Sequence, residues 1–303
     1  MPASLQLWRD RRGRVSALRI VTLLLLVTPI VLAVAAAFTE EGFGARPIND
    51  LIHRAGYWAL VFVLLALAVT PLRRIGRFAR VMDVRRMIGV GAFAYAATHI
   101  SLYIVDQMFD FAKVASEIVL RVYLTIGFTA LLGLTALAVT STDGMVRRLG
   151  AGRWQRLQQL VYAIALLALI HFFQQTKLDV WVPTFVAGLF TWLIGYRLVI
   201  WRRKTNAEPP AWLLLGLAVA VSVLVFLGEA IGIGIAFPVS PLMVLDMAFD
   251  FDLDVIRPGW VVLGAGLAVV ALDIVRAWWR SDARRRTTDD RTGSAKPVAI
   301  SRV

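Results

Sequence analysis

The chain has 303 residues, of which 59% are hydrophobic and only 17% are charged, and its mean hydropathy is +0.71. Soluble domains carry roughly 45–50% apolar and about 25% charged residues, so this composition excludes an ordinary soluble enzyme, a secreted disulfide scaffold and a disordered chain. Because the sequence has no cysteine, it also excludes disulfides, thiolate metal sites, iron–sulfur clusters and covalently attached c-type haem.

Long apolar runs recur along the whole chain and predict an all-α, polytopic membrane helix bundle of about eight transmembrane helices. A hydrocarbon core about 30 Å thick needs about 20 apolar residues per helix. The runs do not alternate as spanning strands would. In chain order, we expect the spans at residues 19–38, 55–72, 87–105, 120–140, 157–174, 181–201, 212–237 and 258–279.

The net charge of +13 is concentrated in alternate connections. Twenty-seven of the 33 Lys and Arg residues fall in the N-terminus, the connections 72–86, 141–156 and 197–211, and the C-terminal tail. Basic residues favour the cytoplasmic side, so both termini are predicted to be cytoplasmic. The basic face would meet anionic membrane lipid, and no nucleic-acid partner is expected.

The apolar runs and the charged segments together divide the chain into four parts. Residues 1–18 are the expected cytoplasmic N-terminus, 19–203 a six-helix transmembrane core, and 204–280 an extra C-terminal two-helix segment that follows a proline-containing joint. Residues 281–303 are rich in Arg, Asp, Thr and Ser without apolar periodicity, which predicts a disordered cytoplasmic tail.

Two of the three histidines, His99 and His171, lie at matching depth on spans that run in the same direction. They follow Arg86 and Arg156 by 13 and 15 residues, which places them about 20 Å and about 22 Å from the cytoplasmic edge at 1.5 Å per residue. Each could be a hydrogen-bonded core residue or line a water cavity. Two imidazoles at one depth instead predict the axial ligands of one b-type haem, and double ligation favours electron transfer.

Two further residues lie near the expected depth of these histidines. Arg121, at the outer end of the fourth span, could pair with a haem propionate or could be an interfacial residue with its charge in the headgroups. His53, at the outer start of the second span, could contact a propionate, replace a ligand or face the interface. A supporting role beside the cofactor is the interpretation we favour for His53.

Six stretches of sequence then point to a family. They are IHRAGYWAL (52–60), VTPL (69–72), RRMIGVGAFAYAATH (85–99), RVYLTIG (121–127), AVTST (138–142) and RWQRLQQLVYAIALLALIHF (153–172). In order and spacing over five helices, they resemble the MsrQ (YedZ) family of haem-binding membrane subunits of periplasmic methionine sulfoxide reductase systems, within the ferric-reductase-like transmembrane superfamily. The resemblance covers about residues 20–200.

The resemblance implies a haem b carrier in the bacterial inner (plasma) membrane, with His99 and His171 as the axial ligands. It would take electrons from a cytoplasmic flavin reductase or a quinone and pass them to a periplasmic molybdopterin reductase subunit. The chain would thus be an electron-transfer subunit of an oxidoreductase rather than a stand-alone catalyst. FMN binding is also implied.

The sequence departs from the family pattern in two places. Gln158 stands where the family usually has a histidine, 13 residues before the second ligand, so one haem is expected. The extra pair of spans after residue 210 is the other departure. Two alternatives stay open, namely a transmembrane ferric or cupric reductase and a haem-free transporter or membrane scaffold.

Overall fold

The computed structural model describes residues 8, 13–38, 46–76, 78–176, 179–204, 208–249 and 256–293, and for 280–293 it describes only the helical backbone. Every element of this described part is a helix. The α-helices are α1 (Ala17–Ala36), α2 (Pro47–Ile75), α3 (Met82–Asp106), α4 (Phe111–Leu120), α5 (Val122–Val139), α6 (Asp143–Leu149), α7 (Ala151–Gln158), α8 (Val161–Gln175), α9 (Trp181–Arg203), α10 (Ala211–Ala236), α11 (Pro241–Asp246) and α12 (Pro258–Gly293). Two short 3-10 helices precede α3 and follow α11.

Eight of these segments are long and apolar enough to cross a membrane. They are α1, α2, α3 with its preceding 3-10 turn, α5, α7 with α8, α9, α10 and the first part of α12. The predicted all-α architecture with eight spans is therefore confirmed, and the chain is a multi-pass membrane protein.

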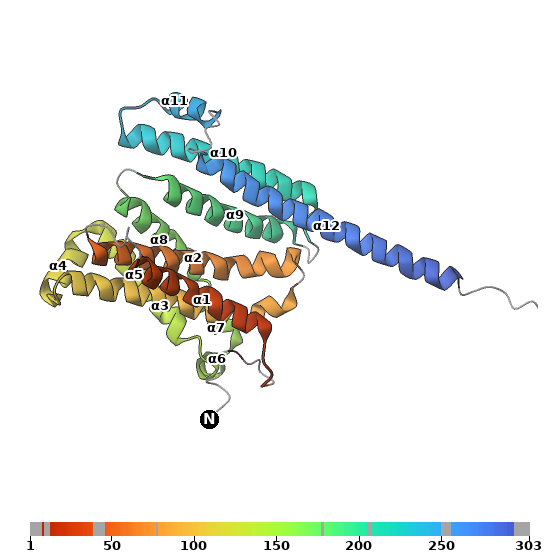
Figure 1. Cartoon of the computed structure of the whole chain (residues 1–303), viewed down its shortest axis with the longest axis horizontal. Helices are drawn as coiled ribbons and strands as arrows, with labels where there is room; N and C mark the ends of the chain where they lie inside the picture. Colours follow the sequence, from red (N-terminus) through yellow and green to blue (C-terminus); the bar gives the residue numbers. More distant parts are fainter. Residues whose placement is uncertain are drawn as a thin grey trace, which may run out of the picture.

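Helices α2, α3, α5 and α8 form a four-helix bundle, and α9 packs on its α2–α8 side. On its other side, α9 contacts α10 and α12, which form a closely packed pair (Figure 1). One continuous apolar core runs through these seven helices. Helix α1 lies outside the bundle against α3, where the Tyr95 hydroxyl donates a 2.7 Å hydrogen bond to the Leu26 carbonyl.

Two boundaries around the bundle differ from the predicted ones. Helix α2 begins at Pro47, eight residues before the apolar run, because a proline in the first turn and Asp50 behind it favour a helix start in a polar segment. Helix α4 is a further difference, because it was not predicted from the sequence. This amphipathic helix is capped by Asp110, whose carboxylate accepts a 2.9 Å hydrogen bond from the Lys113 amide.

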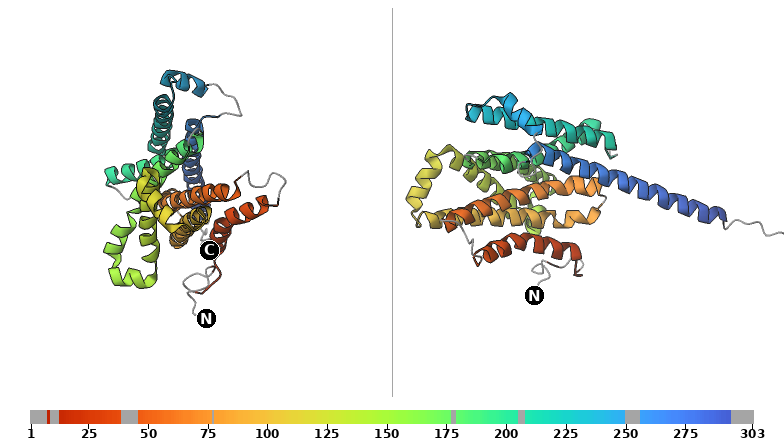
Figure 2. Two further views of the ribbon diagram at one scale, coloured as in Figure 1. Left: turned by 90° about the vertical axis from the view of Figure 1, so that its left-hand side faces the viewer. Right: turned by 45° about the horizontal axis from the view of Figure 1, so that its top comes forward.

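The C-terminal segment also differs from its predicted structure. Helix α12 continues to Gly293 and projects beyond the other helices (Figures 1 and 2), so residues 281–293 are helical rather than disordered. No glycine or proline interrupts the sequence between Gly266 and Gly293, which lets one helix continue past the apolar run. Residues 294–303 lie outside the described residues.

Candidate functional site

The imidazole rings of His99 and His171 lie next to each other in the cavity between the four helices. His99 is on α3 and His171 on α8, their ring centroids are 6.2 Å apart, and the ring planes are nearly perpendicular at 82°. Two metal–imidazole bonds of about 2 Å each, with a ring radius added on each side, place the centroids of two opposite ligands about 6 Å apart. The spacing therefore fits one metal atom between the two rings.

Each ring is held by a hydrogen bond from its Nδ1 to a backbone carbonyl. His99 contacts the Ile52 oxygen of α2 and His171 contacts the Tyr123 oxygen of α5, both at 2.8 Å. A carbonyl only accepts, so each Nδ1 carries the hydrogen and donates it. The lone pair on each Nε2 is then available to a metal, which is the usual arrangement of a metal-binding histidine.

A glycine allows each ring to approach its carbonyl. Gly56 and Gly127 lie four residues after Ile52 and Tyr123, one helical turn further along α2 and α5. A Cβ atom at Gly56 would lie 3.0 Å from the His99 Nδ1, and one at Gly127 would lie 2.8 Å from the His171 Nδ1. Any larger residue would push the ring away from its carbonyl.

The two halves of the bundle repeat this arrangement. In the α2–α3 pair, 47 residues separate Ile52 from His99. In the α5–α8 pair, 48 residues separate Tyr123 from His171. The bundle is thus a pair of similar helix pairs, each of which supplies one anchored imidazole to a shared centre.

Both histidines line a cavity of about 290 Å³ between the four helices. Small side chains from all four helices leave this space open, namely those of Ala59, Ala96, Ala130 and Ala168. Polar residues line the end where α2 begins and α3 and α8 end, and they include Asn49, His53, Tyr103, Asp106 and Gln175. An apolar slot with a polar mouth suits haem, whose macrocycle is apolar and whose propionates are charged.

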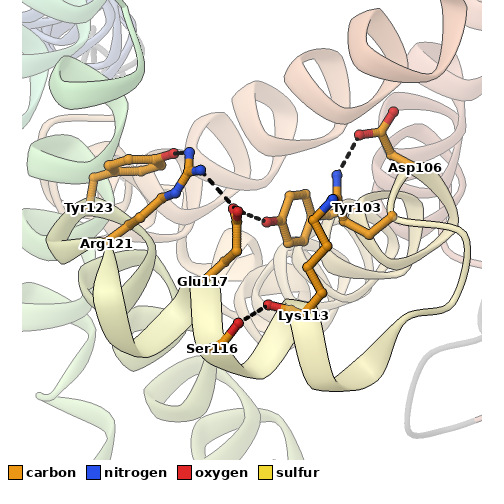
Figure 3. Close-up of polar contacts among 8 residues, drawn as sticks. Tyr103, Asp106, Lys113, Ser116, Glu117, Arg121 and Tyr123 are labelled. Carbon is orange, nitrogen blue, oxygen red and sulfur yellow. Dashed lines mark hydrogen bonds and ion pairs between the residues drawn. The ribbon is translucent and has the colours of Figure 1, made fainter.

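Helix α4 and the residues after it form a polar network beside this mouth (Figure 3). The Glu117 carboxylate accepts hydrogen bonds from the Tyr103 hydroxyl at 3.2 Å and from the Arg121 guanidinium at 2.9 Å. Arg121 also donates to the Tyr123 hydroxyl at 3.2 Å. These two partners, Tyr123 first and the Glu117 charge second, raise the pKa of Arg121 above its ordinary value.

The structure thus brings three of the four predicted site residues to one cavity. His99 and His171 are at its centre and His53 is at its mouth. Arg121 is exposed, does not line the cavity, and is paired with Glu117. Two residues that do line the cavity are linked to Arg121, Tyr123 directly through its hydroxyl and Tyr103 through Glu117.

Gln158 has no place in the cavity. Its side-chain amide donates a 3.3 Å hydrogen bond to the Leu137 carbonyl near the far end of α5. In the described part of the chain, no group of three or more His, Cys, Asp or Glu side chains could hold a metal ion. Two imidazoles alone can serve a metal only where its other ligands come from elsewhere, as a macrocycle supplies them in haem.

Tyr103 and Gln175 are site residues that the sequence analysis missed. Each lies four residues after a histidine, so each shares the face of its helix with His99 or His171. That spacing was the signal that could have identified them. Gly56 and Gly127 gave no comparable signal, because a glycine in an apolar helix has no chemistry of its own.

The chain is similar to a known family and to two named relatives. The model of the family described as "Ferric reductase like transmembrane component" matches residues 51–169. The protein-methionine-sulfoxide reductase heme-binding subunit MsrQ of Rhodospirillum rubrum is 41% identical over 204 residues, which cover 66% of this chain and 95% of the relative. The MsrQ subunit of Xanthomonas campestris pv. campestris is 41% identical over 181 residues, or 57% of this chain and 82% of the relative. No solved structure matches.

Proposed function

Because the chain belongs to the MsrQ family of heme-binding subunits of protein-methionine-sulfoxide reductases, we propose that it is a membrane haem b electron carrier for such a reductase. One observation carries the proposal, namely the pair of carbonyl-anchored imidazoles 6.2 Å apart at the centre of the bundle. Bound haem iron would supply reversible one-electron exchange.

The two histidines and the backbone carbonyls that hold their rings determine the proposed chemistry of the site. His99 and His171 would hold the haem iron, and ligation by two protein side chains would favour electron transfer over binding of oxygen or another substrate. The carbonyls of Ile52 and Tyr123 fix the tautomer and the orientation of the two rings, which would keep both Nε2 lone pairs free to hold the metal. Haem propionates would lie at the polar mouth, beside His53, Asn49 and Tyr103.

The placement of charge supports an orientation of the chain in the membrane, from which the direction of electron flow follows once the partners are assigned. The cavity mouth lies at the end of the bundle opposite the basic connections 72–86 and 141–156, and we assign that end to the periplasm by the positive-inside rule. The donor would be a cytoplasmic flavin reductase or a quinone of the inner membrane. The acceptor would be a periplasmic molybdopterin reductase subunit that repairs methionine sulfoxide.

The absorption spectrum of the purified protein tests the ligand assignment. We expect His99→Ala and His171→Ala each to abolish or convert the low-spin haem spectrum. Gln158→Ala, at the end of α7, is the control, because the Gln158 amide bonds to the Leu137 carbonyl away from the cavity, and its spectrum should be unchanged. A full low-spin spectrum in both histidine variants would refute the assignment.

A transmembrane ferric or cupric reductase is the second candidate function, because the matching family model is described as ferric reductase like. The two functions differ in their acceptor. A metal reductase reduces chelated ferric iron without any partner protein, whereas a reductase subunit needs a protein acceptor. A purified chain without a Soret band, after expression with sufficient haem, would remove both and leave a haem-free transporter or scaffold. FMN binding stays a prediction from the resemblance.

A further inference from the structure

His171 has a second contact with Tyr123 besides the hydrogen bond to its backbone carbonyl. The aromatic ring of Tyr123 lies against the imidazole, with ring centroids 6.5 Å apart and ring planes 28° from parallel. Stacked aromatic rings attract each other at this spacing. One residue of α5 therefore contacts the His171 ring twice, at its Nδ1 through the main chain and at its face through the side chain.

The two contacts restrict different motions of the His171 ring. The hydrogen bond fixes the position of Nδ1, but a ring that is held at one atom can still turn about that atom and tilt its plane. The terminal torsion of a histidine side chain has broad minima, so rotamer preference alone does not set the plane. The nearly parallel ring of Tyr123 resists such a tilt, because the imidazole cannot turn without losing the stacking contact or colliding with the ring.

The other half of the bundle lacks the corresponding contact. Ile52 occupies the place of Tyr123 there, because its carbonyl accepts the hydrogen bond from His99 and a glycine follows it by four residues. The side chain of Ile52 is aliphatic and cannot stack on an imidazole. The two proposed ligands are thus held alike by backbone carbonyls, and they differ in that His171 also has the ring of its anchoring residue against it.

The hydroxyl of Tyr123 matters less to this arrangement than its ring. The hydroxyl accepts a 3.2 Å hydrogen bond from Arg121, whose guanidinium is exposed and can bond to water instead. No described hydrogen bond joins the hydroxyl to His171. The ring is therefore the part of the side chain that acts on the imidazole, and a phenylalanine at this position would supply the same contact.

We propose that Tyr123 is a positioning residue, whose ring sets the plane of the His171 imidazole and keeps it nearly perpendicular to that of His99, at the observed 82°. The inference rests on the proposed haem site and adds a property of the bound iron. Perpendicular axial imidazoles leave two of the iron d orbitals almost equal in energy, whereas parallel ones separate them. The Tyr123 ring would thus tune the iron through the orientation of its ligand.

Electron paramagnetic resonance of the oxidised, haem-loaded full chain tests the proposal, because low-spin ferric iron reports the angle between its ligand planes. Near-perpendicular planes give a strongly anisotropic signal with one prominent low-field feature, and planes closer to parallel give a rhombic signal. We expect the anisotropic signal in the unsubstituted protein and in Tyr123→Phe, which keeps the ring. Tyr123→Leu keeps the backbone carbonyl but removes the ring, so its signal should shift toward the rhombic form. Loss of haem from Tyr123→Leu but not from Tyr123→Phe would also support the proposal.

Tyr95→Leu is the matched control, since it removes a tyrosine ring from α3 at a position that does not line the cavity. It should lower the melting temperature, because the Tyr95 ring contacts Phe62 and its hydroxyl bonds to Leu26, but it should leave the signal unchanged. The proposal is overturned if Tyr123→Leu keeps the unsubstituted signal, or if Tyr123→Phe or Tyr95→Leu shifts the signal as much as Tyr123→Leu does. An unsubstituted chain that binds no haem would instead overturn the proposed function, and the positioning role with it.

Discussion

Gly127 lies directly against the imidazole of His171, so close that a Cβ atom there would be 2.8 Å from both Nδ1 and Cε1 of the ring. The missing side chain is what lets the ring reach the Tyr123 carbonyl one turn earlier on α5. Gly56 has the same relation to His99. The proposed ligand geometry therefore depends on two glycines as much as on the histidines.

A methyl group at Gly127 should displace the His171 ring. We expect Gly127→Ala to lose much of the low-spin haem spectrum, because the ring can no longer keep its carbonyl partner and its place opposite His99 together. Gly56→Ala should have a smaller effect, since its Cβ would lie 3.0 Å rather than 2.8 Å from the ring. The measurement is the absorption spectrum with haem content per chain.

Gly89→Ala, on α3, is the matched control, because a Cβ there would meet nothing within 4 Å. An alanine in such a helical position should leave the spectrum unchanged and stabilise the helix by about 0.4–1 kcal/mol. An unchanged spectrum in Gly127→Ala would show that the close approach is not needed for ligation.

Removal of the Arg121 charge should not affect the cofactor. Arg121 is paired with Glu117 outside the cavity, and exposed pairs four residues apart on a helix contribute about 0.3–0.5 kcal/mol. We therefore expect Arg121→Gln to keep its full haem content and to lose little stability in a thermal unfolding experiment. Loss of haem from this variant would instead assign Arg121 to a propionate, the alternative that the sequence left open.

The ion pair between Glu229 and Arg257 should contribute more to stability than the exposed pair of Arg121 and Glu117, because it is buried. The two groups join α10 to the start of α12 at 3.3 Å, with side chains 3% and 16% exposed. Arg257→Gln leaves a buried carboxylate without its partner and should cost about 3–5 kcal/mol in the free energy of unfolding. The variant that combines it with Glu229→Gln should be more stable than Arg257→Gln alone. Strict additivity of the two effects would contradict a direct interaction.

At position 108, in the turn before α4, glycine should be more stable than the present methionine. Met108 has a φ of 52°, in the left-handed region that costs a non-glycine residue roughly 1–2 kcal/mol, and its side chain is 84% exposed. Met108→Gly should therefore raise the melting temperature. Phe111→Gly, in the first turn of α4, is the comparison and should lower it. A lower melting temperature in Met108→Gly would mean that the side chain contributes contacts of its own.

The sequence predicted the parts of this fold that depend on hydrophobicity. Apolar runs located all eight spans, and the matched depths of His99 and His171 placed the two rings in one layer. The start of α2 at Pro47 was not predicted, because capping and proline chemistry rather than apolarity determine that end. Helix α4 was missed for a related reason, since a short amphipathic segment is too polar to be recognised by a search for spanning runs.

Side-chain orientation was the part that sequence could not supply. Arg121 is near the expected depth of the site, but its guanidinium is directed to Glu117, a choice that depends on where α4 lies. The roles of Gly56 and Gly127 depend on ring contacts within 3.0 Å between helices far apart in the chain. Contacts of this kind arise from packing and leave no periodic pattern in the sequence.

Haem content per chain, measured by the pyridine haemochrome assay, tests the central claim most directly. The account predicts one haem b in the unsubstituted protein and none in the double variant His99→Ala/His171→Ala, provided that both chains are purified from the membrane in folded form. Full haem retention in the double variant would contradict it, as would two haems per chain in the unsubstituted protein.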